Sequence, residues 1–200
     1  MSKPKNTDEH AVQGLISGDR VAFEAVYRRH NGAMVRVASA ILNNRASAEE
    51  IAQDTWMTVL RKIDSFEGRS SLAGWIFTIL TNKAKTRVKR DGRSVSLDTS
   101  DGDDTFDDAF DGRGRWKDAP ELWDEITPDR IVNGRQILSH VGEAIDALPP
   151  AQRAVLILRG QQELEAKEVC DILGLTEANL RVMLHRARFS LRQAIDNIER

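Results

Sequence analysis

A glycine turn followed by a basic helix near the C-terminus is the strongest chemical signal in the sequence. Residues 164–188 fit two helices joined by Gly174-Leu175-Thr176, in which the glycine makes the turn and the threonine caps the second helix. This arrangement predicts a helix-turn-helix, whose second helix brings its first residues to DNA base edges and its flanks to phosphates. The expected base contacts are Thr176, Glu177, Asn179 and Arg181, and the expected phosphate contacts are His185, Arg186 and Arg188. The alternative is a helical hairpin with a solvated basic face.

A second concentration of positive charge ends a predicted helix in the middle of the chain. Its basic residues are Lys83, Lys85, Arg87, Lys89, Arg90 and Arg93. Such a cluster can neutralise phosphates, which is the sequence-independent part of nucleic-acid affinity, and Asn82 and Lys83 are placed to reach a base or a sugar. Trp75 and Phe77, earlier in the same helix, could stack on an unpaired base, although Trp75 also fits the spacing of a helix core.

Helices must position both groups, because no alternating strand pattern occurs before residue 91. Ser47 and Glu50 form a capping box that predicts the start of a helix over about 48–63. Its buried stripe is predicted to comprise Ala52, Thr55, Trp56, Val59, Leu60 and Ile63. After a break, Ser70 or Ser71 can cap the helix that carries the basic cluster.

The spacing of these helices predicts an all-α fold of two small helical domains joined by an acidic flexible linker, with a helix-turn-helix in the C-terminal domain. The chain has 200 residues, enough for two small domains. Seven aspartates and no basic residue occur from Asp98 to Asp111, a stretch that repels itself and buries little. Gly160 is expected to end the helix that precedes the helix-turn-helix. The predicted units are an N-terminal tail (1–10), a helical domain (11–92), the linker (93–130) and the helix-turn-helix domain (131–200).

Composition excludes several classes of protein. Charged residues make up 30% of the chain but the net charge is only −2, so oppositely charged segments matter more than the total. No stretch approaches the roughly 20 apolar residues of a membrane span, which favours a cytoplasmic protein without membrane insertion. Cys170 alone can form neither a disulfide nor a structural zinc site, and is expected to be a small buried hydrophobe. Phosphate loops, nucleotide-binding glycine patterns and paired metal ligands are absent, so no catalytic residue, metal or cofactor is predicted.

Two motifs occur in order along the chain. The first combines AEEIAQDTW (48–56) with FEGRSSLAGWI (66–76), and the second combines LPPAQR (148–153), the helix-turn-helix and LHRAR (184–188). The first resembles the N-terminal domain, and the second the C-terminal domain, of extracytoplasmic-function sigma factors of the sigma-70 family. Together with the segments between them, these motifs cover most of the chain outside the tail and the linker.

The resemblance implies a role for each surface. It implies that the helix over 48–63 docks on core RNA polymerase, with contacts at Glu50, Gln53, Asp54, Trp56 and Met57, although Trp56 equally fits the core. It implies that the loop 65–71 captures a flipped base of the minus-10 promoter element. The expected contacts there and in the following helix are Phe66, Gly68, Arg69, Ser70, Asn82, Lys83 and Arg87. The helix-turn-helix would read the minus-35 element. The implied partners are core RNA polymerase and promoter DNA, and many relatives also bind an anti-sigma factor.

Two other functions remain open from the residues alone. One is a stand-alone helix-turn-helix regulator with an N-terminal sensing domain, and the other is a sigma-like decoy that never touches DNA. Gln53, Asp54 and the loop 66–71 argue against the regulator, and the retained basic residues argue against the decoy. Val182 and Met183 depart from the family pattern after Arg181, so the promoter sequence cannot be read by analogy.

Overall fold

Helices dominate the computed structural model, which describes residues 5–92 and 141–196. The first range contains α1 (Lys5–Ile16), α2 (Arg20–Leu42), α3 (Arg45–Lys62), the 3-10 turn η1 (Ile63–Ser65) and α4 (Leu72–Arg90). The second range contains helical residues 141–147, α6 (Pro150–Leu156), the π-helical turn η4 (Ile157–Gln161), α7 (Ala166–Leu173) and α8 (Glu177–Asp196). These ranges contain no strand, so the all-α prediction is confirmed, whereas the predicted acidic linker lies outside the described residues. None of the described helices combines the length and the apolarity that crossing a bilayer requires.

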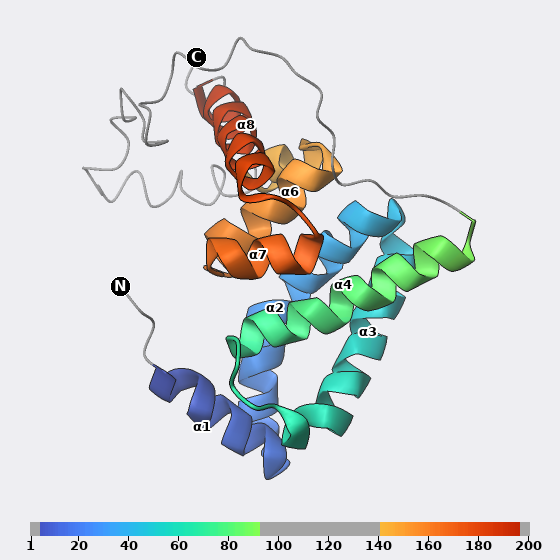
Figure 1. Ribbon diagram of the computed structural model, residues 1–200, viewed down its shortest axis with the longest axis vertical. Coiled ribbons are helices and arrows are strands. Elements are labelled where there is room, and N and C mark those ends of the chain that lie inside the picture. Colours follow the sequence, from blue (N-terminus) through green and yellow to red (C-terminus); the bar gives the residue numbers. More distant parts are fainter. Residues whose placement is uncertain (1–4, 93–140, 197–200) are drawn as a thin grey trace.

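The N-terminal helices form one bundle, in which α2, α3 and α4 pack on one another and α1 lies against α2 (Figure 1). The apolar spacing of α2 explains its place, because Met34, Val37 and Ile41 fall on one face and are buried. Helix α1 begins at Lys5, within the segment that the sequence suggested was a tail. The Asp8 carboxylate accepts a hydrogen bond from the backbone N–H of Leu72 at 3.0 Å, so α1 helps to hold the first turn of α4.

Two asparagines make the turn between α2 and α3. Asn43 adopts the left-handed conformation that ends α2, with φ of 51°. The Asn44 side chain then caps α3 by accepting from the Ser47 backbone N–H at 2.9 Å. The prediction that Ser47 opens this helix with Glu50 is therefore wrong. Asn44 is an equally good acceptor three residues earlier, and it places Ser47 inside the first turn.

The buried stripe of α3 is confirmed except at Leu60. Ala52, Thr55, Trp56, Val59 and Ile63 are all at most 4% exposed, whereas Leu60 is 46% exposed. Leu60 follows Val59 directly, and each residue of a helix turns by about 100°, so Leu60 falls outside the stripe.

Helix α4 is capped by Ser71, whose hydroxyl accepts from the Gly74 backbone N–H at 3.0 Å. Phe77 is fully buried, so the prediction that it could stack on an unpaired base is wrong. Trp75 is only partly buried, and it packs beside the core instead of in its centre.

The predicted helix-turn-helix is formed by α7 and α8. Gly174 takes the left-handed conformation with φ of 76°, which glycine adopts without strain, and Thr176 Oγ1 accepts from the Asn179 backbone N–H at 3.2 Å. Upstream, Gly160 does not end α6, because the chain continues through η4 past it. The left-handed residue there is Glu163, with φ of 54°.

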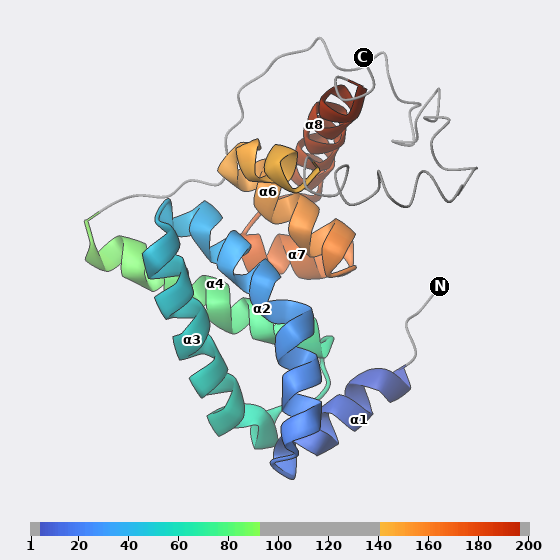
Figure 2. The same cartoon turned by 180° about the vertical axis from the view of Figure 1, so that it is seen from behind.

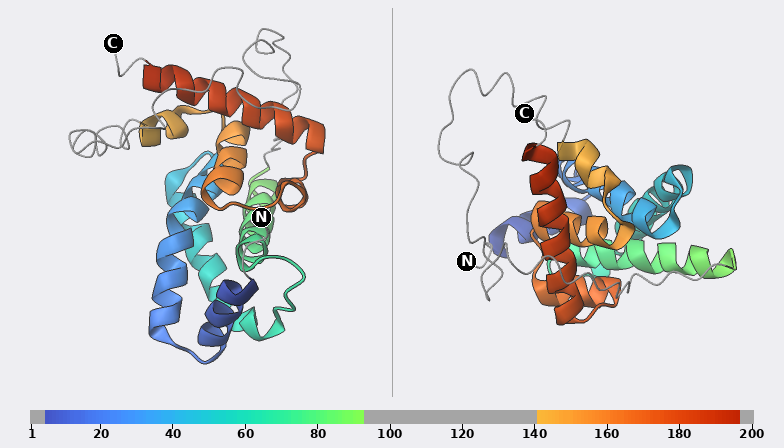
Figure 3. Two further views of the ribbon diagram at one scale, coloured as in Figure 1. Left: turned by 90° about the vertical axis from the view of Figure 1, so that its left-hand side faces the viewer. Right: turned by 90° about the horizontal axis from the view of Figure 1, so that it is seen from above.

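The C-terminal helices pack directly on the N-terminal bundle. Helix α6 and η4 lie against α2, and α7 lies against α4, while α8 lies on the outer side of α6 and α7 (Figures 2 and 3). Buried residues of both parts belong to one apolar cluster, which includes Val37 and Leu158. At its edge, His30 Nδ1 and Gln162 Oε1 lie 2.5 Å apart, and both side chains are buried. The helical periodicity did not predict this contact, because it shows which face is buried but not what covers it.

Candidate functional site

The outward face of α3 presents exposed side chains of mixed chemistry. Gln53 and Asp54 are exposed, and Met57 is 53% exposed although it is apolar. Trp56 differs from them, because it is 4% exposed and its Nε1 donates to Asn31 Oδ1 at 3.0 Å. The structure therefore places Trp56 in the core, directly behind the face that the other three residues present.

Two further apolar residues border this face, and the sequence analysis did not count them as site residues. Leu60 is 46% exposed and Tyr27, from α2, is 38% exposed. The Tyr27 ring packs on Trp56 with 5.3 Å between the ring centroids. Exposed apolar groups that cluster among polar ones are typical of a surface that another protein covers. Leu60 directly follows the buried Val59, so it lies about 100° further around the helix. This position in the sequence could have identified Leu60 as an exposed residue of this face.

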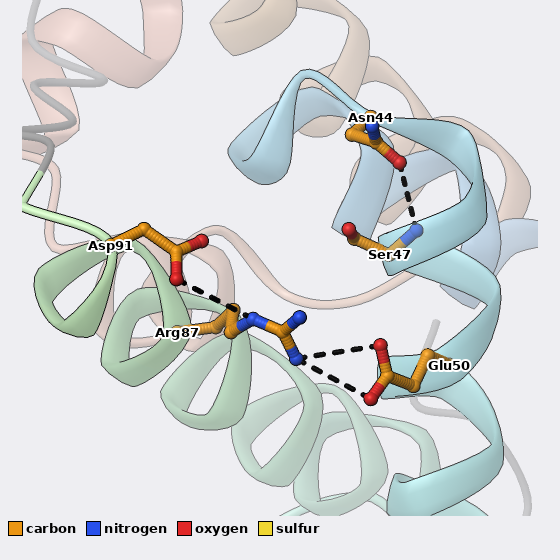
Figure 4. A network of polar contacts seen from close by, with 5 residues as sticks. All are labelled: Asn44, Ser47, Glu50, Arg87 and Asp91. Atoms are coloured by element: carbon orange, nitrogen blue, oxygen red, sulfur yellow. Dashed lines mark hydrogen bonds and ion pairs between the residues drawn. The ribbon is translucent and has the colours of Figure 1, made fainter.

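Arg87 links the end of α4 to α3. Its Nη1 lies 3.4 Å from both carboxylate oxygens of Glu50, and its Nε lies 3.6 Å from Asp91 Oδ1, which is an ion pair without a hydrogen bond (Figure 4). The Arg87 side chain is 26% exposed, so most of its surface faces protein. The structure thus joins one residue expected on the polymerase face to one expected on the DNA face.

The loop before α4 combines an aromatic pair with exposed polar groups. Phe66 packs on Trp75 with 5.4 Å between the ring centroids, and Gly68 holds a left-handed φ of 68°. Arg69 and Ser70 are exposed, and Arg69 forms an ion pair of 2.6 Å with Glu67. A guanidinium beside a partly buried aromatic ring can stack on an unpaired base, and this chemistry suits a single strand better than a duplex.

The basic cluster of α4 is divided by its contacts. Lys85 Nζ donates to the backbone carbonyls of Ile172 and Leu173 at 3.1 and 3.2 Å, so it serves the end of α7. Burial, and then the charge of neighbouring Lys89, lower the pKa of Lys85. Lys89, Arg90 and Asn82 are exposed, and Lys83 is half-buried. Of the predicted cluster, Arg93 lies outside the described residues.

Helix α8 presents its predicted DNA residues around an arc opposite its buried stripe. Leu180, Met183 and Ala187 are at most 5% exposed and form that stripe. The helical repeat of about 3.6 residues turns Arg181 and His185 away from this stripe, and Arg181 is exposed whereas His185 is half-buried. The remaining predicted residues flank this arc or stand at the start of the helix: Thr176, Glu177 and Arg188 are exposed, and Asn179 and Arg186 are half-buried.

Arg181 and Val182 are neighbouring exposed residues of this arc. The Arg181 side chain is 82% exposed and lies 3.8 Å from Glu177 Oε2, while Val182 is 48% exposed. An exposed valine beside an arginine at the start of a recognition helix can contact a thymine methyl group while the arginine grips a base edge. Val182 appeared in the sequence only as a departure from the family pattern. Its neighbour Met183 belongs to the core.

Within the described residues, no cluster of three or more potential metal ligands is assembled. Cys170 is 9% exposed on α7. Burial, followed by the charges of Glu177 and Asp171, raises the pKa of its thiol. The thiol is thus kept in the neutral form that packs as a small apolar group.

Comparison with known proteins identifies the class that this fold and these surfaces define. The Sigma-70 region 2 family matches residues 26–94, which contain the α3 face and the loop before α4. The Sigma-70, region 4 family matches residues 140–191, which contain the helix-turn-helix. The two matches together span more than half of the chain. The chain therefore belongs to the sigma-70 family, in its extracytoplasmic-function group, and its function is that of a sigma factor in promoter-directed transcription initiation.

Relatives agree over nearly the whole length. A probable RNA polymerase sigma factor of Haemophilus influenzae is 26% identical, over 81% of this chain and 84% of the relative. The extracytoplasmic-function sigma factor SigW of Bacillus subtilis is 23% identical, over 94% of this chain and 96% of the relative. Among solved structures, the sigma factor RpoE of Bartonella quintana, crystallised with the anti-sigma factor NepR, is 25% identical. The match covers 87% of this chain and 96% of that chain, with a TM-score of 0.51.

Proposed function

We propose that three surfaces of this sigma factor divide the work of initiation. The α3 face, with Gln53, Asp54 and Met57, docks on core RNA polymerase, and Tyr27 and Leu60 extend this face. The loop before α4 and the start of that helix hold the minus-10 element in single-stranded form. The arc of α8 around Arg181 reads the minus-35 element as duplex. The two functional units are those expected from the sequence, residues 11–92 and 131–200, with the first extended to Lys5, where α1 begins.

The exposure pattern of α8 is the observation that carries this proposal. Arg181 and Val182 stand exposed opposite a buried stripe, at the start of the second helix of a helix-turn-helix. A structural hairpin has no need of such side chains, whereas base readout in the major groove requires them. The chemistry of transcription belongs to the polymerase under this proposal, and the chain acts in the cytoplasm without a cofactor of its own.

Run-off transcription with core RNA polymerase tests the proposal. Genomic upstream fragments are transcribed with and without the full chain, and discrete start sites that require the chain are expected. DNA binding without polymerase, together with no added transcription, would instead favour the stand-alone regulator. A chain that binds neither DNA nor core RNA polymerase would favour the decoy.

The docking face is tested separately. The double variant Gln53→Ala with Asp54→Ala should weaken binding to core RNA polymerase without changing the helix content, because both side chains are exposed. The matched control is Arg45→Ala with Glu49→Ala, an exposed ion pair at the start of the same helix. Equal loss of binding in both variants would show that the effect is not specific to the docking face.

An anti-sigma factor is a further proposed partner. The solved relative from Bartonella quintana was crystallised with such a protein, and it shares the fold of this chain over most of its length. Co-purification with the full chain from its host tests whether such an inhibitor is bound.

A further inference from the structure

The contact between the two halves of the chain combines the shared apolar core with charged groups at both ends of α7. At its start, Glu168 Oε1 accepts from the backbone N–H of Ser71 at 3.0 Å and from the Ser71 hydroxyl at 2.9 Å. At its end, the Lys85 ammonium donates to the carbonyls of Ile172 and Leu173. A carboxylate thus meets the N-terminus of α4, and a cation meets the C-terminus of α7. Both charges complement the helix dipoles.

Glu168 is shared between two helix starts. Its second oxygen, Oε2, lies 3.3 Å from the backbone N of Glu165 and completes the capping box of α7. One carboxylate therefore serves the first turn of α7 and the first turn of α4. Hydrogen bonds to an ionised acceptor are about twice as strong as those between neutral groups, so this contact is well suited to fix how the two helices meet.

Gly74 makes room for this carboxylate. A Cβ atom at position 74 would lie 2.6 Å from Glu168 Oε1 and 3.0 Å from Ser71 Oγ. Any larger residue would push the carboxylate away from Ser71. Gly74 lies in a helix with ordinary backbone angles, where alanine is otherwise favoured over glycine.

The closed arrangement limits how far apart the two DNA-reading surfaces can lie. Glu168 touches the end of the minus-10 loop, and Glu177 at the start of α8 follows it by only nine positions. Even a fully extended chain of nine residues spans at most about 32 Å. The minus-10 and minus-35 elements are named for positions about 25 base pairs apart. At about 3.4 Å per base pair, roughly 85 Å of duplex separates them.

We infer that the free chain is closed by a latch, Glu168 on the start of α4 and Lys85 on the end of α7, and that this latch must open before both promoter elements can be bound. The inhibitory part of this inference rests on the proposed function of the two surfaces. The latch itself does not, because it concerns only the shape of the free chain. Binding to polymerase supplies the free energy that separates the halves.

Fluorescence energy transfer in the free full chain tests the latch. Dyes are attached at Thr86→Cys on α4 and Asp171→Cys on α7, two exposed positions on helices that meet in the closed chain, in a Cys170→Ala background. Transfer should be high in the parent chain and should fall in Gly74→Ala and in Glu168→Ala. The matched control for the first variant is Gly32→Ala, whose Cβ would meet nothing within 4 Å. The control for the second is Glu165→Ala, which weakens the same capping box without touching α4.

Run-off transcription with core RNA polymerase then tests inhibition. The concentration of Gly74→Ala that gives half-maximal transcription should be roughly tenfold lower than that of the parent chain, because less of it is held in the incompetent form. Low transfer in the parent chain, or unchanged transfer in both latch variants, overturns the latch. Open variants with unchanged half-maximal concentrations overturn its inhibitory role. If the variants open but no form of the chain directs transcription, the proposed function fails and the latch stands.

Discussion

Arg181 carries the most specific chemistry of the recognition helix. Among the residues that the structure describes, Arg181 pairs with Glu177 in an exposed ion pair, and such pairs contribute little free energy. Arg181→Ala should therefore leave stability nearly unchanged and cost roughly 1–3 kcal/mol of discrimination at one base pair of the minus-35 element. Competition binding of polymerase holoenzyme to promoter variants measures this. Arg28→Ala removes a comparable ion pair with Glu24 on α2 and should cost no discrimination, so an equal loss there would contradict the assignment.

Cys170 shows how burial controls reactivity at a single residue. Its raised pKa leaves little thiolate near pH 8, and the thiolate is the reactive form. Alkylation by iodoacetamide at pH 8 should be slow in the native chain and fast in denaturant, as followed by mass spectrometry of this one cysteine. Because the folded pKa is raised, the stabilising effect of the neutral thiol is complete below the ordinary value of 9.0 and is lost as the pH rises above it. Rapid alkylation of the native chain would show that the helix-turn-helix opens readily.

Residue types and spacing predicted much of the candidate site at this scale. Arg181 was predicted as a base contact from its place after a turn and a cap, and the structure leaves it exposed on the side away from the core. Arg87 was expected on DNA, but its guanidinium pairs with Glu50 across two helices. The sequence cannot show such a pair, because 37 residues separate the partners and only the packing of α3 on α4 brings them together.

Two residues, Asn44 and Ser47, are candidates for the cap at the start of α3. The structure makes Asn44 its cap, and Ser47 only donates its backbone N–H. Asn44→Ala should lower the free energy of unfolding by about 1 kcal/mol, because an N-terminal backbone donor of the helix loses its partner. Ser47→Ala should change it by less than about 0.5 kcal/mol. Urea unfolding of both variants measures the difference, and the reverse order would restore the capping box predicted from the sequence.

Elements were predicted well where local chemistry decides them. The turn of the helix-turn-helix needs a left-handed residue, and Gly174 supplies it, so sequence and structure agree. At the end of α6 the same reasoning chose Gly160, but the left-handed residue is Glu163. Burial of Leu158 and Leu164 holds this segment in place, so tertiary packing overrides the local preference for glycine.

The shared core makes a prediction for the whole molecule. Leu158 is fully buried in the cluster that joins both halves. Leu158→Ala should cost about 2–5 kcal/mol, and it should lower hydrogen-exchange protection in α2 as well as in α6. Met57→Ala, at an exposed position, should alter neither. Loss of protection confined to α6 would show that the two halves unfold independently.

The relative placement of the halves was beyond the reach of the sequence. Periodicity identified the buried faces of α2 and α4, but other helices of the bundle could have covered them equally well. The contacts that decide the matter, such as Glu168 with Ser71 and Arg36 with Gln161, join residues about a hundred positions apart. No local preference encodes such pairs.

The first turns of α4 and α7 each have a second cap besides the contact between Glu168 and Ser71. When Glu168 leaves Ser71, the Ser71 hydroxyl still accepts from the Gly74 backbone N–H, and α7 still keeps both carboxylates of its own capping box. Neither helix loses its last cap, so the halves can part without either beginning to fray. Separation of Glu168 from Ser71 therefore requires no refolding of either helix start, and we expect it to be reversible.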